Sequence, residues 1–173
     1  MNIKKVSSGK NVPYDINVII EISSHSNPVK YEINKDLGVL FVDRFIPTPM
    51  FYPCNYGFIN DTLSSDKDPI DVLVHSPFPI IPNAVIPCRP IGILKMLDEC
   101  GTDNKIIAIP NVNICPEYSY IKNINEFPDI LKKQIVHFFK HYKDLEKNKW
   151  VKIINWGDKN EAYKEILSAL KKK

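Results

Sequence analysis

NVIIEISSHSNPVKYEINKDLGVLFV, residues 17–42, contains three short runs of β-branched and aromatic residues separated by turn residues. Such runs favour β-strands, and the breaks at residues 27–28 and 36–38 favour turns. Further runs of the same kind follow at residues 71–74, 84–96 and 105–110. This succession of short strands and turns predicts a small barrel or sandwich.

The final third of the chain changes to a helical period. After Pro128, apolar residues recur at the spacing of one helix face, at Leu131, Ile135, Phe138 and Tyr142. Asp158 and Glu161 have the spacing of a capping box and predict a second helix over residues 162–170. No repeat or linker divides the chain, so we expect one domain, residues 1–173, in which two helices pack on a β core.

Composition excludes several classes of protein. Hydrophobic residues make up 44 % and charged residues 25 % of the chain, which argues against disorder. The net charge of +3 is too small to indicate a nucleic-acid partner. No apolar run approaches the ~18 residues that cross a bilayer, so we expect a soluble, unexported, cytoplasmic protein without a membrane partner.

The cysteines support the same location. Cys54, Cys88, Cys100 and Cys115 form no CxxC motif and no disulfide-dense pattern. Reduced thiols in a cytosol are the simplest account of this spacing.

SDKDPIDVLV, residues 65–74, concentrates three acids within six residues. Carboxylates as close as those of Asp66, Asp68 and Asp71 repel one another, so we expect something positive among them. Cations occur nearby in the sequence. In residues 29–33, strand alternation places Lys30 and Glu32 on the face opposite the apolar residues.

Other polar residues adjoin β-type runs or lie in turns, and each has an ordinary explanation when it is considered alone. Charged pairs on strands are mostly solvated, tyrosines in loops mostly pack in a core, and acidic turns are mostly hairpin tips. These candidates are Glu21, Arg44, Tyr52, Tyr56, Asp98, Glu99, Asp103, Lys105, Tyr142 and Lys143. Taken together they predict one acidic and basic site, with Tyr52 and Tyr56 in a loop.

Carboxylates without a paired Cys or His set suit Mg²⁺ or Mn²⁺ better than zinc. His137 and His141 lack the glutamate of HExxH, and we expect them to face solvent. An EF-hand starting at Asp66 fails, because its sixth position is Asp71 and its twelfth is Pro77. A metal site surrounded by lysines, an arginine and tyrosines predicts a small phosphate compound as substrate.

The segments IEI, VKYEI, FVDRF, FYPCNYG, SDKDPIDVL, DECGTDNK and HYKDLE resemble, in order and approximate spacing, those of the soluble family I inorganic pyrophosphatases. The resemblance covers roughly residues 6–156. It implies an OB-type five-stranded barrel with helices, hydrolysis of diphosphate to two orthophosphates by a metal-activated water, and a hexamer as in bacterial members. The implied cofactor is Mg²⁺, several ions per site, with Mn²⁺ or Zn²⁺ as substitutes.

The resemblance also implies a role for each matching residue. Asp68 would be the general base, and Glu21 and Tyr52 would support the site. The implied metal ligands are Glu32, Asp66, Asp71, Asp98 and Asp103, and the implied substrate-binding residues are Lys30, Arg44, Tyr56, Lys105, Tyr142 and Lys143.

Lys67 departs from the family pattern, which usually has a small or polar residue there, often glycine. If residues 66–68 are extended, Lys67 points away from the site while its acidic neighbours face it. Thr102 and Asn104 depart as well, and we expect both to be tolerated variation.

Two alternatives remain open from the residues. A nucleotide-binding OB module would place aromatic platforms in a basic groove, whereas this chain gathers acids. A metal-dependent phosphohydrolase acting on a nucleoside triphosphate would need a base-stacking pocket, and no segment supplies one.

Overall fold

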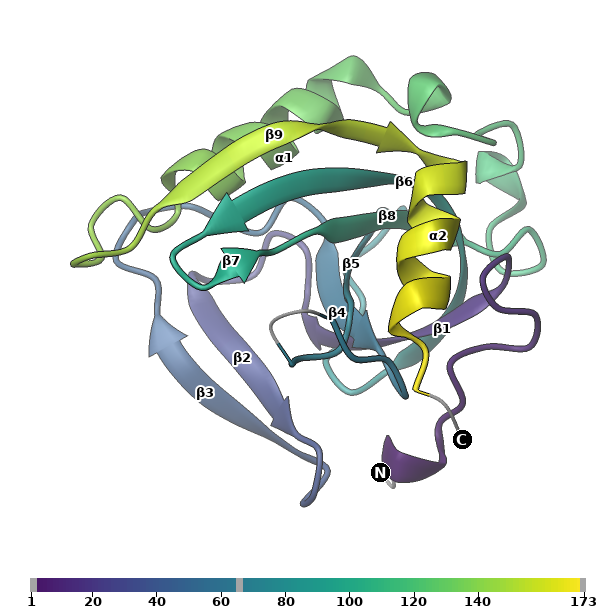
Figure 1. Ribbon diagram of the computed structural model, residues 1–173, viewed down its shortest axis with the longest axis horizontal. Helices are drawn as coiled ribbons and strands as arrows, with labels where there is room; N and C mark the ends of the chain where they lie inside the picture. The colour runs from purple at the N-terminus through teal and green to yellow at the C-terminus, as the bar shows by residue number, and fades with distance from the viewer. Residues whose placement is uncertain (1–2, 65–66, 172–173) are drawn as a thin grey trace.

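The computed structural model describes residues 3–64 and 67–171. The chain folds into strands with two α-helices near its C-terminal end (Figure 1). The strands are β1 Ile16–Ile22, β2 Val29–Asn34, β3 Val39–Phe45, β4 Asn55–Ile59, β5 Asp71–Val74, β6 Val85–Asp98, β7 Gly101–Thr102, β8 Lys105–Pro110 and β9 Val151–Asp158. The helices are α1 Asp129–His141 and α2 Lys159–Ala169, with short 3-10 turns at Ile3–Lys5, Pro116–Tyr118 and Ile124–Glu126.

Five strands close into a ring. β1 pairs with β4, β4 with β5, β5 with β8, β8 with β6, and β6 pairs back with β1. β5 and β8 run parallel, and the other pairs in the ring are antiparallel. β9 extends the sheet from β6. The predicted class, mainly β with a small closed strand arrangement and two helices, is confirmed.

β2 and β3 form a separate two-stranded hairpin that projects beside the ring (Figure 1). Their register shifts between Lys30 and Tyr31, which is the signature of a bulge. Lys30 and Glu32 of the hairpin line the same cavity as Tyr56 of β4 and Asp71 of β5.

Strand alternation divides the core between the two helices. Leu73 and Ile107 belong to the cluster that includes Phe138 of α1, whereas Val72 and Ile106 belong to the cluster that includes Ile166 of α2. Successive side chains of β5 and β8 therefore face opposite sides of the sheet, and both sides are covered.

The second helix was predicted at residues 162–170 and begins at Lys159. Its capping box is present, because Asp158 accepts from the backbone N–H of Glu161, and Glu161 accepts from that of Asp158. Helix α1 buries Ile135 and Phe138, and His137 and His141 are exposed, as predicted.

Two strand assignments from sequence were wrong. Tyr56 was expected in a loop, but it lies in β4, a fully buried strand. Gly57 allows this strand to lie close to β1, since a Cβ at Gly57 would come within 2.0 Å of the Ile19 carbonyl oxygen. The last third was expected to be helical, yet it also contributes β9 between the two helices.

Two further observations concern the chain as a whole. Within residues 3–64 and 67–171, no helix is long and apolar enough to span a membrane. All four cysteines are free thiols, and Cys54, Cys88 and Cys115 are buried.

Candidate functional site

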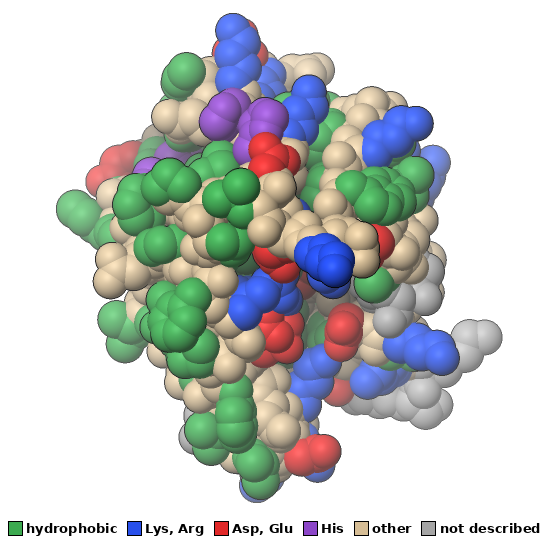
Figure 2. Space-filling view, turned by 90° about the vertical axis from the view of Figure 1, so that its left-hand side faces the viewer, with side chains coloured by type: hydrophobic (Ala, Val, Ile, Leu, Met, Phe, Trp, Pro, Cys, Tyr) green, Lys and Arg blue, Asp and Glu red, His purple; other side chains and the backbone are tan. Residues whose placement is uncertain are grey.

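A cavity of about 310 Å³ lies where the β2–β3 hairpin faces the ring. Charged side chains of both signs gather in the middle of this face, beside a hydrophobic flank (Figure 2). Every predicted site residue that the structure describes lines the cavity, namely Glu21, Lys30, Glu32, Arg44, Tyr52, Tyr56, Asp68, Asp71, Asp98, Asp103, Lys105, Tyr142 and Lys143. Asp66, the remaining predicted ligand, lies outside the described residues.

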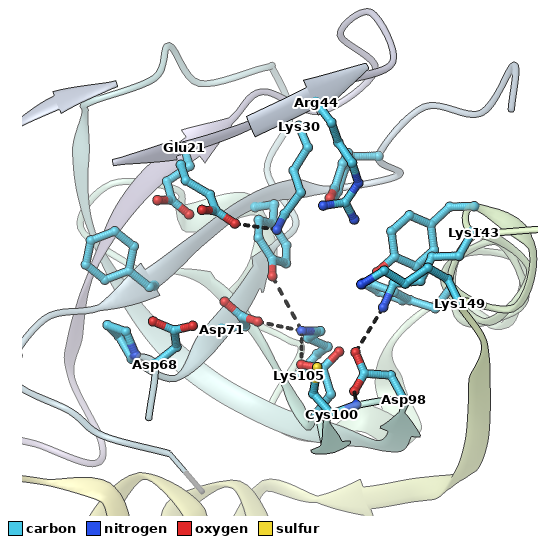
Figure 3. Close-up of a pocket in the computed structure, with 18 of the residues that line it drawn as sticks. Glu21, Lys30, Arg44, Asp68, Asp71, Asp98, Cys100, Lys105, Lys143 and Lys149 are labelled. Atoms are coloured by element: carbon cyan, nitrogen blue, oxygen red, sulfur yellow. Dashed lines mark hydrogen bonds and ion pairs between the residues drawn. The ribbon is translucent and has the colours of Figure 1, made fainter. Parts of the chain in front are cut away.

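Lys105 sits at the floor of the cavity. Its Nζ lies 2.5 Å from Asp71 Oδ2 and 2.5 Å from Asp103 Oδ1, and 3.4 Å from the Tyr56 hydroxyl (Figure 3). The parallel register of β5 and β8 pairs Asp71 directly with Lys105. Burial alone would lower the pKa of Lys105, but the carboxylates of Asp71 and Asp103 outweigh burial and raise it. Lys105 is therefore a fixed cation.

At Asp103 burial outweighs the neighbouring charge in setting the pKa, whereas at Lys105 the neighbouring charges outweigh burial. Burial of Asp103 raises the pKa of its carboxyl group above the usual range, although the Lys105 ammonium opposes this shift. The shift reflects a carboxylate removed from water and stabilised chiefly by one neighbouring cation.

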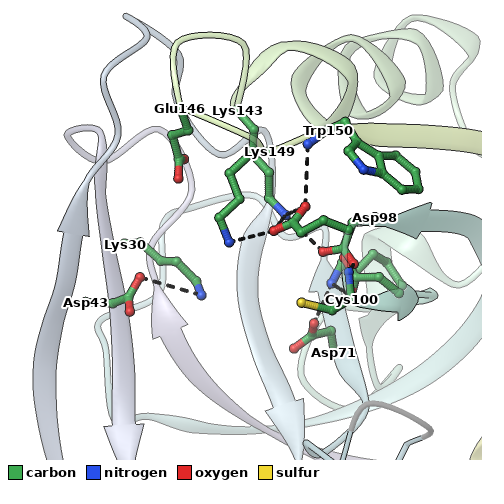
Figure 4. Close-up of polar contacts among 12 residues, drawn as sticks. Lys30, Asp43, Asp71, Asp98, Cys100, Lys143, Glu146, Lys149 and Trp150 are labelled. Atoms are coloured by element: carbon green, nitrogen blue, oxygen red, sulfur yellow. Dashed lines mark hydrogen bonds and ion pairs between the residues drawn. The ribbon is translucent and has the colours of Figure 1, made fainter.

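Lys143 and Lys149 close the rim beyond α1 (Figure 4). Lys143 Nζ lies 2.9 Å from Asp98 Oδ2 and 3.2 Å from Glu99 Oε2, and Lys149 lies 2.6 Å from Glu99 Oε1. Burial opposes ionisation of Glu99, but hydrogen bonds from Lys149 and Lys143 outweigh it and lower the pKa to about 2. Glu99 thus forms ion pairs with both Lys143 and Lys149 at this rim.

The opposite rim belongs to the hairpin. Arg44 donates to Asp43 at 2.5 Å and lies 3.2 Å from Glu146. Lys30 pairs with Glu32 and lies 3.7 Å from Asp43. Alternation along β2 therefore presents Lys30 and Glu32 on one polar face, as predicted. Figure 3 shows Lys30 and Arg44 extending from the hairpin into the space above Asp71 and Lys105.

Glu21 is a buried carboxyl group, 7 % exposed, at the end of β1. Burial is the largest influence and raises the pKa of Glu21 to about 8, although the Ile33 N–H donates to its Oε1 at 2.7 Å. This hydrogen bond also fastens the hairpin to the ring.

Asp68 occupies an open side of the cavity. Its side chain is 76 % exposed and lies 3.2 Å from Lys35 Nζ. The carboxylate is thus accessible from solvent at the mouth of the cavity.

The backbone expectation for the neighbouring Lys67 was wrong. Its φ of 72° is left-handed rather than extended. The side chain is nevertheless exposed and does not line the cavity.

Aromatic rings form the back wall. Tyr52 packs on Tyr56 with ring centroids 5.1 Å apart, and Tyr142 stacks on Phe138 at 5.0 Å. Burial raises the pKa of both Tyr52 and Tyr56 well above that of a free phenol, so their hydroxyl groups remain protonated donors.

The donor set fits a hard divalent cation. The cavity contains carboxylates from five segments, and Asp71 and Asp103 already converge on one ammonium group. Oxygen donors of this kind suit Mg²⁺ or Mn²⁺. Among the residues that the structure describes, no three Asp, Glu, His or Cys side chains form a ready-made metal cluster.

Lys35, Cys100 and Lys149 also line the cavity, although the sequence analysis did not name them as candidates. Glu99, a candidate without a predicted role, lines the cavity as well and pairs there with Lys143 and Lys149. Lys35 and Lys149 resemble ordinary surface lysines in the sequence, and nothing in their neighbours distinguishes them.

Comparisons with known proteins agree on one family. The model of the family described as inorganic pyrophosphatase matches residues 18–173. An inorganic pyrophosphatase of Buchnera aphidicola is 66 % identical over 99 % of this chain and 98 % of its own, and one of Escherichia coli K12 is 54 % identical over the same shares.

Solved structures show the same agreement. A protein of Anaplasma phagocytophilum described as an inorganic phosphatase has a TM-score of 0.94 at 48 % identity, covering 96 % of this chain and 97 % of its own. The inorganic pyrophosphatase of Thermus thermophilus has a TM-score of 0.92 at 38 % identity, covering 98 % and 97 %.

Proposed function

Because this chain belongs to the inorganic pyrophosphatase family, and so hydrolyses inorganic diphosphate to orthophosphate, we propose that the reaction takes place in the cavity between the hairpin and the ring. Family membership selects this reaction over a nucleotide-binding module and over a nucleoside triphosphatase. The observation that carries the location is the convergence of lysines, an arginine and carboxylates from many segments on one space.

The family depends on a divalent metal, and we propose Mg²⁺ for this chain, with Mn²⁺ or Zn²⁺ as substitutes. Asp71 and Asp103 at the floor, together with Asp66, would hold the principal ions, and Asp98 and Glu32 would hold further ones. When bound, the metal supplies positive charge that lowers the pKa of water and neutralises phosphate oxygens.

Cations at the two rims would bind the substrate. Lys30, Arg44 and Lys143 pair with carboxylates at the cavity surface, and phosphate oxygens can take over these interactions when diphosphate enters. Lys105 is buried and is held by Asp71 and Asp103, and it would contribute a fixed charge, with the Tyr56 and Tyr142 hydroxyl groups as additional donors. Preorganised charge of this kind stabilises charge that builds up on the departing phosphate.

Asp68 would accept the proton from the attacking water. Its carboxylate is open to solvent at the cavity mouth, where a water molecule can reach it. Glu21 and Tyr52 would keep the hairpin and the back wall in place behind it, through the bond to Ile33 and contact with Tyr56.

We also propose a cytoplasmic homohexamer. Four free thiols suit a reducing compartment. Large apolar side chains such as Phe45, Phe78 and Ile81, each about three-quarters exposed, are suited to burial between subunits. Sedimentation at six times the 19.9 kDa monomer mass would agree with this, and a monomer would contradict it.

The reaction is tested by phosphate release from diphosphate, tripolyphosphate and ATP with Mg²⁺. Diphosphate should be hydrolysed fastest, and comparable rates on ATP would contradict the assignment.

Asp68→Asn keeps the side-chain shape but accepts no proton, so turnover should fall by ~10² to 10⁴ while diphosphate still binds. Asp36→Asn, which alters an exposed aspartate away from the cavity, is the matched control. Near-full turnover of Asp68→Asn would remove Asp68 from this role.

A further inference from the structure

The ladder between β6 and β8 is interrupted next to the cavity floor. Leu94 pairs with Lys105, and Leu97 pairs with Thr102 of β7, but the residues between them, 95–96 and 103–104, do not pair in register. One backbone bond persists there, from the Asp103 N–H to the Met96 carbonyl oxygen at 2.9 Å.

The side chain of Asn104 bridges this interruption. The Met96 N–H donates to Asn104 Oδ1 at 3.3 Å, so the side-chain oxygen takes the place of a backbone acceptor. Asn104 Nδ2 then donates to Glu165 Oε1 of α2 at 3.2 Å. Met96 is fully buried, so without Asn104 its N–H would lose this acceptor in a place that water does not reach.

Asn104 lies between two residues of the cavity floor. Asp103 and Lys105 extend to the same side, where they pair at 2.5 Å, while the Asn104 side chain reaches α2. A backbone shift at residue 104 would therefore move both partners of the floor pair and also the Lys105 contact to Asp71.

We propose that Asn104 is a positioning residue, which fixes Asp103 and Lys105 for metal and substrate binding through its hydrogen bonds to Met96 and Glu165. The proposal rests on the floor roles of Asp103 and Lys105 given above. It replaces the expectation that Asn104 is tolerated variation.

If Asn104 only fastened α2 to the sheet, its loss should act like the loss of any other polar link between α2 and this edge, with no separate effect on Mg²⁺ binding. Helix α2 has a second such link. Lys95 of β6 pairs with Glu161, one helical turn before Glu165. Lys95→Met breaks that link without touching the floor, and it serves as the matched control.

The test compares Asn104→Leu, which has similar size but no hydrogen bonds, with Lys95→Met and Glu165→Gln. Binding of Mg²⁺ alone is measured by calorimetry without substrate, and kcat, KM and melting temperature are measured separately. Asn104→Leu should weaken Mg²⁺ binding and raise KM by about five- to twentyfold, the loss expected when a buried donor loses its acceptor. Glu165→Gln still accepts from Asn104 and should resemble wild type, and Lys95→Met should lower only the melting temperature.

A rescue pair covers the case in which Asn104→Leu does not fold. Asn104→Asp places a carboxylate against Glu165 and should weaken Mg²⁺ binding, whereas Asn104→Asp combined with Glu165→Gln restores a donor and an acceptor and should recover most of it. Failure of that recovery, or equal Mg²⁺ affinity in Asn104→Leu and Lys95→Met, would overturn the proposal. Asp103→Asn is measured in parallel, because wild-type behaviour of that variant would overturn the floor assignment itself.

Discussion

Lys67 has a backbone conformation that suits glycine. A φ of 72° brings Cβ close to the carbonyl oxygen, which costs an L-residue roughly 1 to 2 kcal/mol. Glycine adopts this conformation at little cost, so this position favours glycine, contrary to the extended geometry expected from sequence.

Lys67→Gly should stabilise the protein. Relief of the left-handed strain exceeds the extra unfolded-state entropy of glycine, leaving a gain of about 0.5 to 1 kcal/mol and a melting temperature higher by roughly 1 to 4 °C. Scanning calorimetry measures this shift. Asn148→Gly is the matched control, because Asn148 has a φ of 61° but asparagine tolerates this region, so little change is expected. A lower melting temperature for Lys67→Gly would show that the lysine side chain contributes more than its backbone costs.

At the scale of elements, the hairpin is joined to β1 through Glu21. The carboxyl group with its pKa near 8 is mostly protonated in the folded protein at neutral pH, whereas a glutamate in the unfolded chain ionises near 4.5. The folded state therefore binds more protons, and the stability from this group is complete below about pH 4.5 and is lost as the pH rises toward 8.

Glu21→Gln should flatten this pH dependence. Between pH 5 and 8, the free energy of unfolding of the wild type should fall by roughly 2 to 4 kcal/mol more than that of Glu21→Gln. Urea unfolding is measured with a chelator present, because a bound cation would favour the ionised carboxylate. Glu117→Gln, at an exposed glutamate, should keep the wild-type slope. Parallel curves for wild type and Glu21→Gln would contradict the raised pKa.

Most strands could be predicted from sequence because their apolar residues are consecutive or alternate, as in β5 and β8. β4 was missed because its formation depends on a long-range contact, the close approach of Gly57 to β1, and not on local propensity. β9 was missed although Val151, Ile153 and Trp156 are β-favouring and pack against the core, because it lies between two helical segments and its place is set by pairing with β6.

Some residues of the candidate site could likewise be predicted from sequence, and others could not. Acids and cations in recognisable segments could be assigned, since their residue types carry the chemistry. Asn104 and Lys149 could not, because their roles depend on contacts with Glu165 and Glu99, which lie 61 and 50 positions away in the chain.

At the scale of the molecule, the cavity collects acids that repel one another unless cations separate them. The proposed divalent metal would bind the folded cavity and not the unfolded chain, so Mg²⁺ should stabilise the entire fold. At one hundred times its dissociation constant, the gain is about 2.7 kcal/mol.

Thermal melts in rising Mg²⁺ should therefore show a steadily increasing melting temperature. Asp71→Asn, which removes a floor carboxylate, should shift the rise to higher Mg²⁺ concentrations, whereas Asp36→Asn should follow the wild type. Na⁺ at equal ionic strength controls for screening. A rise that is identical in Asp71→Asn would place the metal elsewhere.

The pairing of Asp71 with Lys105 across the parallel strands also bears on how the protein folds. These residues are 34 positions apart, and they meet only when β5 and β8 join. Contacts between distant parts of a chain form late, because the loop between them must first close. During refolding, catalytic activity should thus return with the slowest phase that closes the ring. The recovered rate of diphosphate hydrolysis would then measure the fraction of completely folded molecules. A compact intermediate that contains most of the strands would have no activity.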